Sequence, residues 1–125
     1  MKSAVVTLVA MLNAPLVGAH HSYADYELDE RYVFSGTLTD VFWGNPHILL
    51  FISDGTTTMR IEWITTTGAD VTGVAQQQFA PGDSITVTGS RNRNSIVDTM
   101  TVIKELEMTD KDWRWVRPSR RSSNP

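Results

Sequence analysis

The chain has 125 residues, of which 41% are hydrophobic and 20% are charged. A chain of this length holds one domain with a modest core, which excludes a multidomain enzyme. The formal net charge of -3 argues against nucleic acid as a partner, because nucleic-acid binders normally present a strongly basic face. Cysteine is absent, so disulfides and thiolate chemistry are excluded, and any imidazole chemistry falls to three histidines.

Residues 1–19 have the pattern of a secretory signal peptide. Lys2 precedes an apolar stretch from Ala4 to Leu12, and the small residues Val17 and Ala19 precede the expected cleavage point. The apolar stretch is about half of the roughly 20 residues that a membrane helix needs, so we expect no membrane span in the mature chain. We therefore expect cleavage after Ala19, a new N-terminus at His20, and a periplasmic or secreted protein.

Residues 20–31 form an acidic arm, and short runs rich in β-branched and aromatic residues then predict five strands. The predicted strands are residues 32–43, 47–52, 58–64, 84–89 and 95–107. A bend near Gly36 would let the first strand serve two parts of one sheet. Met59, Ile61 and Trp63 alternate in the third strand, and Met100, Val102 and Leu106 are predicted to share the inner face of the fifth.

The segment between the third and fourth strands holds the one helix candidate, around residues 70–79. This order predicts an all-β, five-stranded, OB-like Greek-key barrel over residues 32–112, with a small β-sandwich as the alternative. Residues 113–125 are predicted to be a Trp- and Arg-rich tail. Because a small barrel fills its own interior, we expect any ligand on a face or at a loop mouth.

The histidines predict a metal site. After cleavage, the new α-amine and the rings of His20 and His21 would lie within one chelate, and His47 would add a third imidazole. Nitrogen ligands of this kind suit Cu(II) best among Cu(II), Ni(II) and Zn(II). The alternative is that His47 packs or caps a turn and that His20 and His21 are ordinary polar residues.

A second candidate site is aromatic. Trp43, Asn45 and Trp63 could bind a small ligand or another exported protein on a barrel face, with the histidines structural. Core packing is the competing interpretation of the aromatic residues.

Enzyme chemistry has weaker support in the sequence. The carboxylates are spread over the arm and strands, with no evident cleft for a paired-acid mechanism and no GxSxG nucleophile motif. A redox enzyme built on an N-terminal histidine is a third alternative. We expect a binding protein rather than an enzyme.

Several short motifs resemble those of one known family. They are Ala19-His20-His21-Ser22, Phe42-Trp43-Gly44-Asn45-Pro46-His47, Glu62-Trp63 and the run from Pro81 to Gly89. In combination they are similar to the DUF6152 family of small exported bacterial proteins. The resemblance implies an exported β-barrel protein without an assigned biochemical role. The segment 68–79 departs from that family's pattern, and the Trp- and Arg-rich tail lies outside it.

Overall fold

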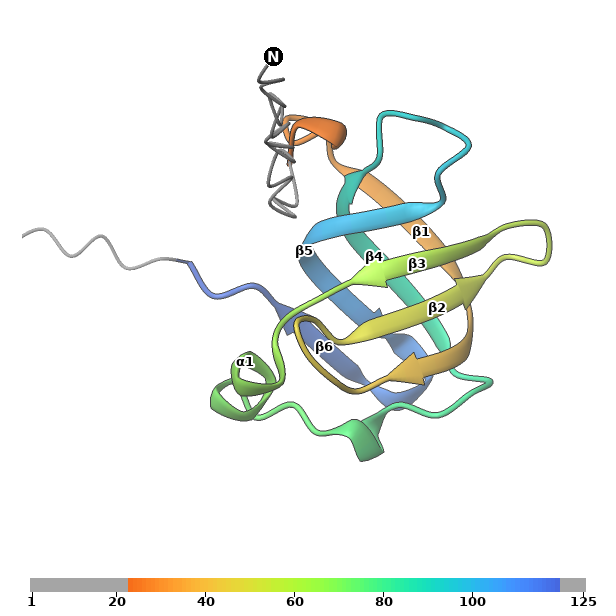
Figure 1. Ribbon diagram of the computed structural model, residues 1–125. Helices are drawn as coiled ribbons and strands as arrows, with labels where there is room; N and C mark the ends of the chain where they lie inside the picture. The colour runs from red at the N-terminus through yellow and green to blue at the C-terminus, as the bar shows by residue number, and fades with distance from the viewer. Residues whose placement is uncertain (1–22, 120–125) are drawn as a thin grey trace, which may run out of the picture.

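The computed structural model describes residues 23–119, which form a β-barrel with short helical connections (Figure 1). The strands are β1 (Tyr32–Phe42), β2 (Leu49–Ser53), β3 (Thr58–Glu62), β4 (Ser84–Arg91), β5 (Thr99–Met108) and β6 (Trp113–Val116). The helical elements are α1 (Thr66–Val71) and three 3₁₀ turns, η1 (Tyr23–Asp25), η2 (Gln76–Gln78) and η3 (Thr109–Lys111). No helix within residues 23–119 is long and apolar enough to cross a membrane.

Five of the strands close into the predicted OB-like barrel. β1 pairs antiparallel with β2 and β4, β2 pairs with β3, and β4 pairs with β5. A parallel pairing of β3 with β5 closes the ring. The position of α1 between β3 and β4 also matches the predicted order, so the fold class is confirmed.

The first strand pairs with two neighbours, as predicted, and its register with β2 shifts between Leu38 and Asp40, just after Gly36. Residues 32–37 are in register with β4, and residues 37–42 are in register with β2. Gly36 lies at the change of partner, where a Cβ atom would stand 2.4 Å from the carbonyl oxygen of Ser53. A residue without a side chain is therefore needed for the close approach of β1 to the end of β2.

The core follows the strand alternation, with one correction. Met59, Ile61 and Trp63 are buried as predicted, and so are Met100 and Leu106. Val102 is only half-buried, and Ile103 enters the core instead. The cause is a bulge in β5: the register with β4 shifts between Thr88 and Ser90, and Val102 has a left-handed φ of 47°. Two steps of β4, from Thr88 to Ser90, stand opposite four steps of β5, from Glu105 to Thr101, and a bulge of this kind interrupts the alternation of a regular strand.

The helix lies earlier in the chain than predicted. Thr65 caps its start by accepting a hydrogen bond from the backbone nitrogen of Gly68, and α1 covers residues 66–71 rather than 70–79. Gly73 then takes a positive φ of 74°, which glycine adopts readily. Residues 76–78 form the separate turn η2.

The first four residues of the predicted tail form a strand. Residues 113–116 form β6, which pairs antiparallel with β5 from Glu105 to Met108. Trp115 is only 6% exposed, while Val116 is 54% exposed, so the short segment alternates like a strand. An ion pair of 2.7 Å between Arg114 and Glu105 also joins the two strands.

Candidate functional site

The structure describes one of the three predicted metal ligands. His47 is half-buried, whereas His20 and His21 lie outside the described residues. Within residues 23–119, no group of three or more histidine, aspartate and glutamate side chains could hold a metal ion.

His47 is the second-last residue of the loop, residues 43–48, that connects β1 with β2. The loop turns at a cis peptide bond between Asn45 and Pro46. The next residue, Ile48, is bonded on both sides of its backbone. Its nitrogen donates to the carbonyl oxygen of Ile64 at 2.8 Å, and the carbonyl oxygen of Ile48 accepts from the nitrogen of Trp63 at 3.0 Å. These two bonds fix the backbone of His47 beside the segment that leaves β3.

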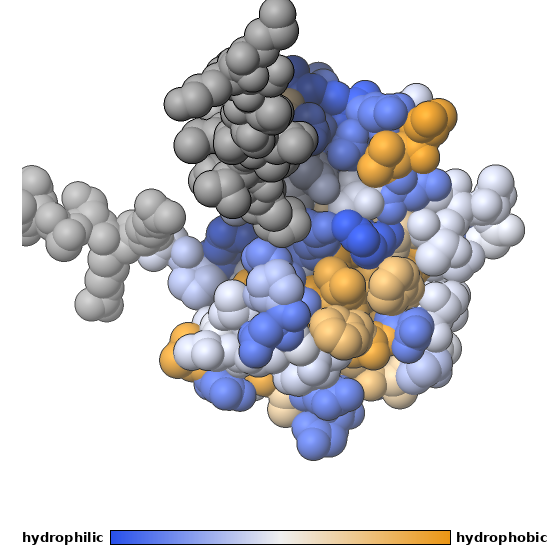
Figure 2. Space-filling model, in the orientation of Figure 1, coloured by the Kyte–Doolittle hydropathy of each residue, from blue (hydrophilic) through white to orange (hydrophobic). Residues whose placement is uncertain are grey.

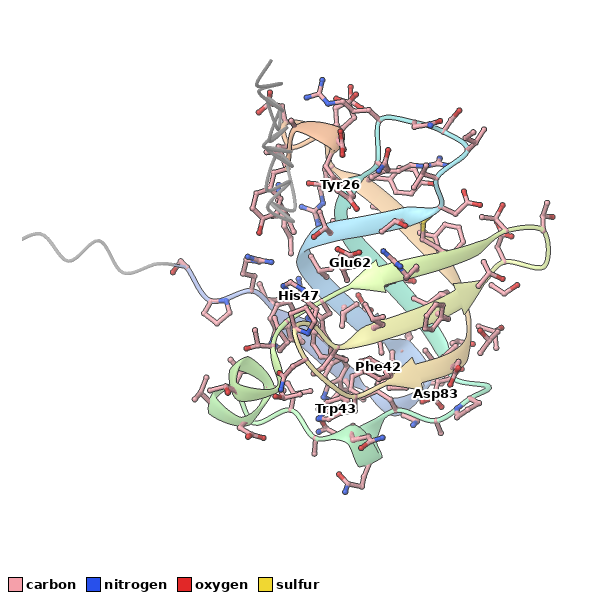
Figure 3. All side chains as sticks on the ribbon, in the orientation of Figure 1. Tyr26, Phe42, Trp43, His47, Glu62 and Asp83 are labelled. Atoms are coloured by element: carbon pink, nitrogen blue, oxygen red, sulfur yellow. The ribbon has the colours of Figure 1, made fainter. Side chains whose placement is uncertain are left out.

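His47 lines a surface hollow of about 270 Å³, which we call the seam hollow. It lies where the end of β3, the bulge of β5 and the segment after β6 meet, and Figure 3 shows His47 between α1 and that segment. Six of its lining residues carry polar atoms in their side chains: Tyr23, His47, Trp63, Thr65, Thr101 and Arg117. Because these residues are far apart in the sequence, the fold is what brings them together.

Arg117 is the residue of this hollow that sequence reasoning missed. Its backbone nitrogen donates to the carbonyl oxygen of Lys104 at 2.8 Å, and its Nε donates to the carbonyl oxygen of Ile103 at 2.7 Å. None of the residues between 23 and 119 that line the hollow is acidic. The alternation of Trp113 and Trp115 was the signal that could have extended the strand and placed Arg117 next to the barrel.

The arm before β1 is also attached to the barrel, at Tyr26 and Glu27. Tyr26 forms an isolated antiparallel bridge with Asn92, and the nitrogen of Glu27 donates to the carbonyl oxygen of Arg91 at 2.9 Å. Burial raises the pKa of the Tyr26 phenol, and the negative charge of Glu62 raises it further. The arm is thus held against the barrel three residues after Tyr23, which lines the seam hollow.

Each of the three predicted ligand-binding residues has a packing or hydrogen-bond partner among the described residues. Trp63 is 3% exposed and lines the seam hollow, but its ring packs edge-on against Phe79, Trp113 and Trp115 at centroid distances of 5.5, 6.5 and 5.2 Å. Trp43 is half-buried and packs on Phe79 at 6.0 Å. Asn45 is exposed, and its Oδ1 accepts from the Thr66 hydroxyl at 3.1 Å. Packing and loop attachment account for most of what these side chains do.

An apolar patch lies on the outer face of β1 and β2. Phe42, 51% exposed, is in register with Leu49, and Phe51 is the next outward residue of β2. We call these three residues the outer patch. Figure 2 shows hydrophobic side chains gathered over this part of the surface, where Figure 3 places Phe42. The neighbouring row of β3 carries an ion pair of Arg60 with Glu62.

These features define a small OB-like β-barrel protein with a polar, non-acidic hollow at the end of the loop between β1 and β2. Comparison with protein families gives a match over residues 8–101 to a family of unknown function, DUF6152. The chain belongs to this family, as its motifs suggest. Comparison with curated proteins finds no match.

Proposed function

We propose that the chain is an exported, non-catalytic binding protein that takes a transition metal, copper first, at the seam hollow. The ligands would be His47, the imidazoles of His20 and His21, and the α-amine that cleavage after Ala19 would create. The observation that carries this proposal is that Tyr23 and His47 line the same hollow. The proposed role rests on binding, because the hollow beside His47 supplies a place for a ligand.

Covalent geometry supports the proximity of the histidines. An extended chain spans at most about 3.6 Å per residue, so the Cα atom of His21 lies within roughly 7 Å of that of Tyr23. The side chains of His21 and His47 extend the reach of the two residues toward each other. The chain is therefore long enough for His21, and for His20 before it, to meet the ring of His47 on a common ion.

The charge of the hollow places a condition on the metal. Arg117 supplies a positive charge and no lining residue supplies a negative one, so a cation there is repelled in the absence of an anion. Neutral imidazole and amine nitrogen would have to provide the affinity, which again favours Cu(II), the ion that binds nitrogen ligands most tightly in the divalent series.

Calorimetric titration of the exported protein with Cu(II) tests the proposal, after mass spectrometry has established its N-terminus. We expect sub-micromolar binding that His47→Ala weakens by roughly tenfold or more, since even indirect support of a metal ligand is worth that much. A form that retains Ala19 should also bind more weakly. Asn45→Ala is the matched control, because Asn45 is in the same loop and does not line the hollow. Binding that is equal in the wild type and His47→Ala would refute the proposal.

The second candidate function is an accessory module that binds a protein or small ligand on the barrel face. The outer patch favours it, because Phe42 is half-exposed among other apolar side chains of the same face. Under this proposal Phe42→Ser would abolish co-purification of a partner from a cell-envelope extract and leave copper binding unchanged. Retention of the partner by Phe42→Ser would exclude the patch.

A further inference from the structure

The seam hollow has the chemistry of an anion site, independently of any metal. Arg117 uses its Nε on the carbonyl oxygen of Ile103, at 2.7 Å, and no other hydrogen bond of its guanidinium to the described residues is observed. A guanidinium whose terminal N–H groups are directed together can hold two oxygens of one carboxylate or phosphate. The backbone bond from Arg117 to Lys104 holds the residue in place before any ligand arrives.

The other polar groups of the hollow are also donors or can act as donors. Thr65 and Thr101 carry hydroxyls, Tyr23 carries a phenol, and His47 carries an imidazole. The Thr65 oxygen accepts from Gly68, which leaves its own proton able to point elsewhere. Among the described residues that line the hollow there is no aspartate or glutamate, whose charge would repel an anion.

Size restricts the ligand. A volume of about 270 Å³ corresponds to roughly nine water molecules of liquid. An oxyanion of a few heavy atoms fits in this volume with some of its water. We infer that the seam hollow binds a small oxyanion, a phosphate or a short carboxylate, through the guanidinium of Arg117 with the imidazole of His47 and the hydroxyls of Thr65 and Thr101.

This inference deepens the proposed function, on which it rests for the use of the hollow as a ligand site, and it requires no metal. The two ligands would assist each other, because an anion beside Arg117 offsets the repulsion that a metal at His47 would meet. The coupling between two binding sites is reciprocal. If the anion raises the affinity for the metal, the metal raises the affinity for the anion by the same factor.

The test is an NMR titration of the full exported chain, freed of metal on a chelating resin, with inorganic phosphate and, separately, with succinate. We expect at least one of the two to shift the amide signals of Ile48, Thr101 and Arg117 saturably, in the millimolar range or below. Arg117→Gln should weaken this binding about tenfold, as expected for a hydrogen-bonded charge. Arg117→Lys, which keeps the charge and loses the fork, should give an intermediate affinity.

Arg114→Gln is the matched control. Arg114 lies in β6, three residues before Arg117, and its side chain donates to Glu105 instead of lining the hollow. It should bind the anion as the wild type does. No saturable shifts with either anion, or equal losses in Arg114→Gln and Arg117→Gln, would overturn the inference. Anion binding without copper binding would support the anion site and refute the metal proposal. Copper binding without anion binding would support the metal proposal and refute the anion site.

Discussion

The Nε of Arg117 donates a hydrogen bond to the carbonyl oxygen of Ile103, 2.7 Å away, at the bulge of β5. This bond joins the segment after β6 to the strand that closes the barrel, and it fixes a positive charge in the hollow that His47 also lines. The bulge, the sixth strand and the candidate site are therefore parts of one arrangement.

The guanidinium should influence metal binding in a definite direction. In buffer without oxyanions, Arg117→Gln should raise the affinity for Cu(II) by roughly three- to tenfold, because it removes one neighbouring unit charge from a water-exposed site. The measurement is calorimetry in a non-coordinating buffer. An unchanged affinity in Arg117→Gln would mean that copper binds away from the seam hollow.

The sixth strand should contribute to the stability of the barrel. Trp115→Ala removes a buried ring that packs against Trp63 at 5.2 Å, so we expect a loss of about 3 to 5 kcal/mol in the free energy of unfolding. Val116→Ala, at an exposed position of the same strand, should change it by about 0.5 kcal/mol or less. Urea denaturation measures both. A loss below about 1 kcal/mol for Trp115→Ala would show that residues 113–116 behave as a tail.

The bend of β1 depends on Gly36. Gly36→Ala would place a Cβ atom 2.4 Å from the backbone oxygen of Ser53, and backbone cannot move away as a flexible side chain can. We expect a loss of about 1 to 3 kcal/mol in unfolding free energy. Gly68→Ala is the control: its Cβ would stand 3.2 Å from the Thr65 Oγ1, and alanine favours the helix by about 1 kcal/mol, so little loss is expected. Equal stability of Gly36→Ala and wild type in urea would contradict this account of the bend.

Asp83 should make the stability depend on pH. Its carboxylate accepts hydrogen bonds from Lys111 at 2.7 Å and from the nitrogen of Ala80 at 2.8 Å. Burial raises the pKa of Asp83, but these bonds outweigh it and hold the pKa below its ordinary value. Because the folded state favours the charged form, the interaction stabilises the protein above the ordinary aspartate pKa, about 3.9, and is lost as the pH falls through the lowered one.

Urea unfolding of Asp83→Asn and wild type between neutral and strongly acidic pH measures this contribution. The variant should be less stable at neutral pH, by about 1 kcal/mol for a partly exposed charged hydrogen bond, and the difference should shrink in acid. Asp110→Asn, at an exposed position nearby, is the control for the substitution itself and should change the free energy of unfolding at neutral pH by about 0.5 kcal/mol or less. A difference between Asp83→Asn and wild type that stays constant with pH would be evidence against the interaction.

The barrel could be predicted from sequence because its signals are local. Strand alternation, the glycine bend and the turns at residues 54–55 and 81–83 each follow from a few neighbouring residues. The bulge at Val102 could not be predicted, because it arises from the register between β4 and β5 rather than from β5 itself. The sixth strand has only four residues, Trp113–Val116, which is too short for the alternation alone to distinguish it from a tail.

The candidate site was predicted in part for the same reason. His47 stood out by rarity and by its place after Asn45-Pro46. Arg117 is one of several arginines near the C-terminus, and what distinguishes it is the pair of bonds to Ile103 and Lys104. These bonds follow from the pairing of β5 with β6, for which the alternation of Trp113 and Trp115 was the only signal named above.

The central claim is that copper binds in the seam hollow, which His47 and Tyr23 both line. Paramagnetic broadening of NMR signals tests this claim most directly. Substoichiometric Cu(II) is added to the ¹⁵N-labelled exported protein, and amide signals are followed one by one. The account predicts that Tyr23, Ile48, Ile64 and Thr101, which line or flank the hollow, broaden first, and that Asp54 and Gly55 in the distant β2–β3 turn do not. Broadening that spares Ile48, Ile64 and Thr101 would contradict the metal site at His47.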